Sequence, residues 1–105
     1  MAGPVDEEKV REALMTVKDP ELGFDIVNLG LVYGLDIHEG KVYVKMTLTT
    51  PACAAGPFIV EQVKEAVRRV PGVEDVDVEL VWQPRWTEDM MSEELKEILR
   101  WGMYR

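Results

Sequence analysis

One cysteine is the residue of this chain best suited to chemistry. Cys53 lies in the stretch TTPACAAG that covers residues 49–56, and a helix is expected to begin close behind it, near Pro57. Unpaired N–H groups and the positive dipole end of that helix would stabilise a thiolate. Free cysteines are also often buried as small apolar residues, but this one stands outside every apolar stripe. The position therefore favours a reactive thiol, which small neighbours leave open to another molecule.

Residues that could support this thiol are less distinctive. Asp19 and Glu21 flank a proline and could supply hard oxygen ligands or an acid–base group, but ordinary helix termination with solvated charges is the favoured explanation of these two residues. Thr50 could hydrogen-bond the loop backbone or an incoming ligand, while its preference for strands accounts for it without any function.

The single histidine and a tryptophan pair complete the set of candidates. His38 falls beside an expected hairpin turn, so we expect it to be exposed and to lie at the opposite edge of the sheet from Cys53. A Cys–His hydrolase is therefore disfavoured. Core packing would explain Trp82, whereas Trp86 beside Arg85 would suit the docking of a partner protein.

Other motifs that carry chemistry are missing from the sequence. It has no glycine-rich phosphate loop, no pair of CxxC motifs and no histidine cluster with the spacing of metal ligands. The sequence thus gives no support for ATP use or for a structural zinc site.

Charge and cysteine content narrow the classes of partner and compartment. The 105 residues include 20 acidic and 12 basic side chains, for a net charge of −8. Such a surface repels phosphate groups, which disfavours nucleic acids and anionic membranes and favours a partner with a basic docking face. One cysteine excludes an intrachain disulfide, no signal peptide is visible in residues 1–10, and no apolar run approaches the roughly 20 residues of a membrane span. We expect a cytoplasmic protein.

Hydrophobic periodicity predicts the elements that position these residues. A helix begins at the N-cap Asp6 and is stopped by Pro20, and residues 21–30 form an irregular connection. Strands over residues 31–38 and 42–49 form a hairpin around the turn Glu39-Gly40. A helix over residues 57–70 precedes a strand over residues 76–82, and Ser92 caps a last helix.

This order indicates the fold class. Strand, helix, strand is a crossover unit, so the third strand should run parallel to the second. We therefore expect residues 1–105 to form a single two-layer α+β domain with a small mixed sheet and the order helix-strand-strand-helix-strand-helix.

Several landmarks in a fixed order point to a known family. They are Asp19-Pro20-Glu21, the stretch NLGLV at 28–32, the stretch TLTTP at 47–51 with Cys53, PGV at 71–73, and a segment from Trp82 through Trp86 to Glu93. In this order and spacing, nearly the whole chain resembles the SufT and PaaD-like family of metal–sulfur cluster biosynthetic proteins. The resemblance implies the fold of the iron–sulfur cluster assembly domain and a role in maturing iron–sulfur proteins.

The resemblance also assigns residues and partners. It implies that Cys53 is the functional residue, that Asp19 is the matching acid, and that iron–sulfur assembly or carrier proteins and apo client proteins are the partners. Two departures argue against a stable cluster on one chain: Ala54 follows the cysteine where proline is common, and Gly56 stands where cluster-scaffold relatives have a second cysteine. We expect no stably bound cofactor, and a transient iron–sulfur cluster shared with a partner at Cys53.

The leading interpretation is a non-enzymatic assembly or transfer factor. A PaaD-like accessory protein of a phenylacetyl-CoA oxygenase ranks second, because that branch usually has an additional cysteine-rich tail and this chain stops at Arg105. Two further alternatives remain: a thiol-dependent enzyme with Cys53 as nucleophile and Asp19 or Glu21 as base, and an interaction module in which the cysteine is incidental. Whether the domain is a monomer or a homodimer is left open.

Overall fold

The computed structural model describes residues 5–20, 22–49 and 56–102 of the chain, apart from the side chains of residues 101 and 102. Its elements are α1 (Glu7–Leu14), β1 (Val32–His38), β2 (Lys41–Met46), α2 (Gly56–Arg68), β3 (Asp75–Leu80), the short 3-10 helix η1 (Glu88–Met90) and α3 (Glu93–Gly102). The expected α+β order is confirmed, and η1 is the one described element that the sequence pattern did not predict.

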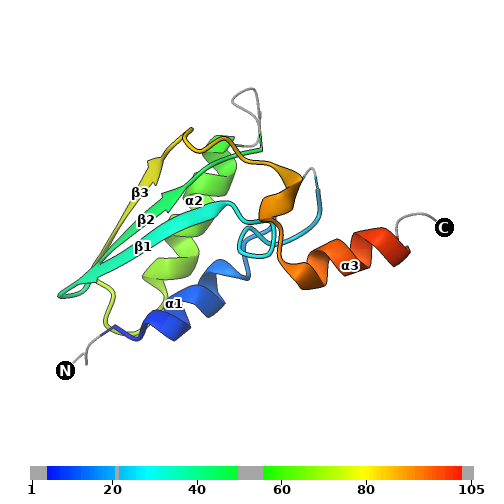
Figure 1. The fold of residues 1–105 in the computed structure, drawn as a ribbon. Helices are drawn as coiled ribbons and strands as arrows, with labels where there is room; N and C mark the ends of the chain where they lie inside the picture. The colour runs from blue at the N-terminus through cyan, green and yellow to red at the C-terminus, as the bar shows by residue number, and fades with distance from the viewer. Residues whose placement is uncertain (1–4, 21, 50–55, 103–105) are drawn as a thin grey trace.

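Three strands form the mixed sheet, in the order β1-β2-β3 (Figure 1). β1 pairs antiparallel with β2, and β3 pairs parallel with β2 after the α2 crossover, as expected. The hairpin turn has positive φ angles of 47° at Glu39 and 90° at Gly40. Two consecutive residues in this region match the twist of a two-residue hairpin loop, so the predicted turn is confirmed.

A register shift interrupts β1. Val32 pairs with Met46, but Gly34 pairs with Lys45, so Tyr33 is an extra residue on its strand. The bulge breaks the alternation of side chains along the strand, so Val32 rather than Tyr33 packs against the core. A bulge of this kind re-aims one side chain out of the regular pleat.

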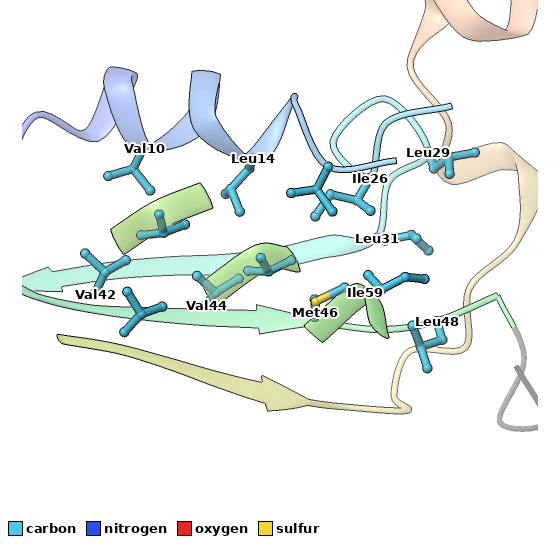
Figure 2. Close-up of a cluster of buried hydrophobic side chains, with 14 of the residues drawn as sticks. Val10, Leu14, Ile26, Leu29, Leu31, Val42, Val44, Met46, Leu48 and Ile59 are labelled. Atoms are coloured by element: carbon cyan, nitrogen blue, oxygen red, sulfur yellow. The ribbon is translucent and has the colours of Figure 1, made fainter. Parts of the chain in front are cut away.

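The core lies between the sheet and the two helices that cover one of its faces (Figure 2). β2 contributes alternate residues to the core, and α2 contributes one stripe of buried residues. Burying each such side chain contributes about 1.5–3 kcal/mol. The fully buried apolar side chains include Val10, Leu14, Ile26, Leu29, Leu31, Val42, Val44, Met46, Ile59, Val63 and Val67.

The ends of α1 agree only in part with the prediction. Asp6 is the N-cap, and its carboxylate accepts the N–H of the residue two positions later at 2.9 Å. The helix ends at Leu14, however, well before Pro20. The chain leaves the helix in a turn, in which the Thr16 hydroxyl donates to the Ala13 carbonyl at 2.6 Å. Termination is therefore local, and the proline that was expected to stop the helix lies beyond it.

α3 leads away from the sheet and from α1 and α2 (Figure 1). The Ser92 hydroxyl oxygen accepts the Leu95 N–H at 3.1 Å, which confirms the predicted cap. Leu95 is buried, whereas Ile98 on the same helix is 54% exposed. None of the described helices has both the length and the apolar character needed to cross a membrane.

Candidate functional site

The candidate site lies where β2 leads toward α2. Cys53 and Thr50 belong to the segment of residues 50–55, and they fall outside the described residues, as does Glu21. The residues on both sides of the segment are described. Because β2 and β3 are parallel, their carboxyl ends meet at the same edge of the sheet, and α2 begins at that edge. In open α/β sheets, ligands bind at the carboxyl ends of the parallel strands.

The start of α2 packs closely on the end of the preceding strand. A Cβ atom added at Gly56 would lie 2.7 Å from Cδ1 of Leu48, which is itself only 5% exposed. Any larger residue at position 56 requires Leu48 to move. The glycine at this position is therefore explained by packing, and it allows the helix to begin directly against the strand end.

A pocket of about 280 Å³ lies beside this strand end. It joins the residues before the cysteine segment to the bend that follows β3. Its side chains are mixed, with two indoles, one guanidinium, one amide and two hydroxyls, which are the features of a small recognition pocket. The residues that line it are Thr47, Leu48, Thr49, Trp82, Gln83, Arg85 and Trp86.

The two tryptophans of the pocket have different environments. Trp86 is half-buried against the core, and its indole N–H donates to the Leu29 carbonyl at 2.7 Å. Trp82, which core packing was expected to explain, is instead 40% exposed. Arg85 is exposed as well. The structure thus brings Trp86 and Arg85 to the edge that carries the cysteine segment, while their docking role stays a prediction.

A turn at residues 28–30 holds residues 82–92, the segment after β3 that carries these side chains and forms one wall of the pocket. Gly30 has a φ of +79°, and a Cβ there would lie 2.7 Å from the carbonyl carbon of Met90 and closer still to its oxygen. The Ser92 N–H donates to the Asn28 carbonyl at 2.8 Å. Asn28 is fixed in turn by Asp25, whose carboxylate accepts its side-chain N–H at 2.6 Å. The sequence marked this turn only as a family landmark, and no pattern in it indicated this contact.

The β1 bulge supplies a second anchor for the same segment. The Tyr33 hydroxyl donates to the Pro84 carbonyl at 2.7 Å and lies 3.3 Å from Sδ of Met90. Desolvation raises the pKa of the Tyr33 phenol above its ordinary value. The phenol therefore stays protonated and keeps its role as a donor. The sequence pattern did not indicate this residue, because a bulge leaves no signal in an alternating pattern.

Asp19 was expected to be a solvated charge at a helix end, and the structure shows that this expectation is wrong. Its side chain is 0% exposed, and Oδ1 accepts the Leu22 N–H at 3.3 Å. Its backbone closes the same turn, since its N–H donates to the Phe24 carbonyl at 3.0 Å and its carbonyl accepts the Gly23 N–H at 2.7 Å. This buried aspartate therefore organises the turn that follows it, and any role as an acid or a ligand stays a prediction.

His38 lies far from this edge in the topology of the sheet. It is exposed and pairs with Lys41 beside the hairpin turn, at the opposite end of β2 from the cysteine segment. The predicted exposure is confirmed. Within the described part of the chain, no three histidine, cysteine or acidic residues are grouped so that they could hold a metal ion.

Comparisons with known proteins agree with this arrangement. Residues 7–80 match the family model described as iron-sulfur cluster assembly protein. The chain is 51% identical over 87 residues to the Fe-S protein maturation auxiliary factor YitW of Bacillus subtilis, covering 82% of this chain and 85% of that protein. It is 53% identical over 77 residues to the Fe-S protein maturation auxiliary factor SufT of Staphylococcus aureus, covering 72% and 88%.

A solved structure shows the same fold. The domain of unknown function DUF59 from Bacillus anthracis superimposes with a TM-score of 0.84 at 40% identity, over 90% of this chain and 91% of that one. The family match covers most of the chain, and the fold agrees over almost all of it. The chain therefore belongs to the iron–sulfur cluster assembly protein family.

Proposed function

We propose that this chain is a maturation factor for iron–sulfur proteins, which assembles or transfers clusters through the Cys53 thiol. The proposal is supported by the family match and by relatives that are named maturation auxiliary factors. The compartment would be the cytoplasm, where reducing conditions keep thiols free. The partners would be assembly or carrier proteins and apo client proteins.

One observation carries the proposal: the cysteine segment is anchored at both ends beside a pocket. Thr49 lines the pocket, and Gly56 packs against Leu48. Cys53 is four residues from the first anchor and three from the second. A chain spans at most about 3.6 Å per residue, so covalent geometry alone keeps its Cα within about 14 Å and 11 Å of those two anchors. The thiol and the pocket would therefore be presented to the same partner.

The chemistry would be ligand exchange at cluster iron. The thiolate sulfur of Cys53 would bind one iron, the donor-protein thiolate that held this iron would leave, and the leaving thiolate would take up the proton that the Cys53 thiol releases. An iron–sulfur cluster is usually held by four protein ligands, mostly thiolates, and this chain has one cysteine. Donor or client side chains would supply the others, which makes residence on this chain transient. Arg85, Trp82 and Trp86 would hold the partner during the exchange.

A transfer assay tests this function. A cluster-loaded scaffold protein is mixed anaerobically with apo-ferredoxin, and cluster arrival is followed by visible absorbance, with catalytic amounts of this chain. Cys53→Ser should remove the acceleration without changing the melting temperature by more than a few degrees. Glu65→Gln on the exposed face of α2 is the matched control and should transfer normally. Equal acceleration by wild type and Cys53→Ser would refute the role of the thiol.

The stoichiometry of cluster binding is a second test. After anaerobic reconstitution, iron and sulfide are measured across a size-exclusion profile. A monomer with one thiolate should elute without a cluster, and any cluster should elute with a dimer or a partner complex. A stable monomer that carries a complete cluster would contradict the transfer model.

A further inference from the structure

The outer edge of β3 has no neighbouring strand in the part of the chain that the structure describes. In the order β1-β2-β3, β3 pairs with β2 alone. No described helix or strand lies beyond it (Figure 1). An edge of this kind presents backbone donors and acceptors to solvent and is a template for another strand.

The ladder shows which residues of β3 face β2. Asp75 donates its N–H to the Gly40 carbonyl at 3.3 Å, and Val81, just after the strand, donates to the Met46 carbonyl at 2.9 Å. Backbone groups of alternate residues point to opposite sides of a strand. The odd-numbered residues of β3 therefore bond to β2, and the even-numbered residues turn their N–H and C=O groups to the open edge.

These outward groups are only partly occupied within β3. The Val76 N–H donates to the side chain of Asp75 at 3.0 Å, which blocks the first outward donor. Among the described residues, none bonds to the outward N–H and C=O groups of Val78 and Leu80 on the open edge. Leu80 also exposes 37% of its surface, so the far half of the strand offers apolar contact as well.

Side chains add a charge pattern to this edge. Asp75, Asp77 and Glu79 stand at every second position, and all three are exposed on the sheet face that α1 and α2 do not cover. Asp75 pairs with Lys41 at 3.6 Å. Among the described side chains, no ion pair reaches the carboxylates of Asp77 and Glu79.

We propose that β3 receives an extended basic segment of a partner protein as a fourth strand of the sheet. Lysines or arginines at alternate positions of that segment would lie directly across from Asp77 and Glu79, and its intervening apolar residues would cover Val78 and Leu80. Opposite charges that face each other across strands stabilise a pairing, and like charges destabilise it. A second copy of β3 would place carboxylates against carboxylates, so the pattern selects a basic partner rather than a homodimer.

Two synthetic peptides of equal composition test the proposal. One alternates lysine and valine over seven residues, and the other has the same residues with all lysines contiguous. The alternating peptide should bind at least about fivefold more tightly and should slow amide hydrogen exchange at Val78 and Leu80 by about tenfold. Equal binding of both peptides, with no slowing of exchange at these amides, would show general attraction to an acidic protein and overturn strand addition.

Variants separate charge from backbone pairing. The double substitution Asp77→Asn and Glu79→Gln should weaken the alternating peptide about fivefold, whereas Glu61→Gln with Glu65→Gln on α2 removes the same charge and should change binding less than twofold. Leu80→Pro deletes one outward N–H that the β2 ladder does not use, so the fold should persist while binding falls. A similar loss of peptide binding from both double substitutions would contradict strand addition at β3. Full peptide binding by a folded Leu80→Pro variant would also contradict it.

Discussion

Replacing Gly30 by alanine should detach residues 82–92, the segment that forms one wall of the pocket, from the turn at residues 28–30. The added Cβ would lie 2.7 Å from the carbonyl carbon of Met90, and the atom it approaches is backbone, which cannot rotate away. The turn and the segment must therefore separate by roughly 1 Å to restore ordinary contact distances. That movement would break the hydrogen bonds from Ser92 to Asn28 at 2.8 Å and from Trp86 to Leu29 at 2.7 Å.

The expected loss of stability can be summed from these contacts. The left-handed φ of +79° costs an alanine about 1–2 kcal/mol. Two lost hydrogen bonds add about 1 kcal/mol each. Partial exposure of Met91 and Leu95, which are 8% and 2% exposed, adds about 1 kcal/mol or more. The total is about 4–5 kcal/mol, or a fall in melting temperature of roughly 20 °C for a domain of this size.

Gly23→Ala is the matched control, because Gly23 has nearly the same φ of +81° and nothing within 4 Å of the added Cβ. It should cost only the backbone term of about 1–2 kcal/mol. Urea unfolding followed by circular dichroism gives both free energies, and tryptophan emission reports Trp86 as the wall detaches. If the two variants lost equal stability, the close contact between Gly30 and Met90 would not be what holds the segment.

The other predictions concern side chains that face or hold the pocket. Trp86→Phe should lower the free energy of unfolding by about 1–2 kcal/mol, because a carbonyl loses its partner, whereas Trp82→Ala should change it by less than about 1 kcal/mol and should slow cluster transfer. Equal effects on urea stability would contradict this division. For Tyr33 the sign follows from its raised pKa: the stability that the neutral phenol contributes is present below the unfolded pKa of about 10 and is lost as pH rises through the higher folded value. Wild type should therefore lose stability above pH 10 more steeply than Tyr33→Phe, and parallel pH profiles from urea titrations would refute it.

The element order could be predicted because periodicity differs between helices and strands. Apolar residues recur at every second position in β2 (Val42, Val44 and Met46) and four positions apart in α2 (Ile59 and Val63). These spacings indicate the type of each element and the face that it buries. The crossover rule then gave the parallel direction of β3 without any knowledge of contacts. These are local or topological rules, and the structure follows them.

Burial near element ends could not be predicted in the same way. Leu80 and Trp82 continue the alternating pattern of the third strand, and core packing was expected for Trp82, yet the two side chains are 37% and 40% exposed. Periodicity states which face a side chain lies on, but not whether another element covers that face. Asp19 shows the converse error, since a charged residue after a helix was expected in solvent and is instead 0% exposed within a turn.

The contacts that anchor the pocket wall could not be predicted from the sequence for a related reason. Its three anchoring contacts on the turn at 28–30 all use backbone: the Asn28 carbonyl, the Leu29 carbonyl, and the bare Cα of Gly30. Every residue type has a carbonyl, so hydrophobic patterns and side-chain chemistry carry no signal of such contacts. Because the wall is held before any partner arrives, a partner that binds there need not pay to order it, and less of its contact energy is lost on docking. The pocket wall thus combines an anchored backbone with one exposed indole, that of Trp82. Such a surface suits specific but short-lived binding, which the transfer of a cluster between proteins requires.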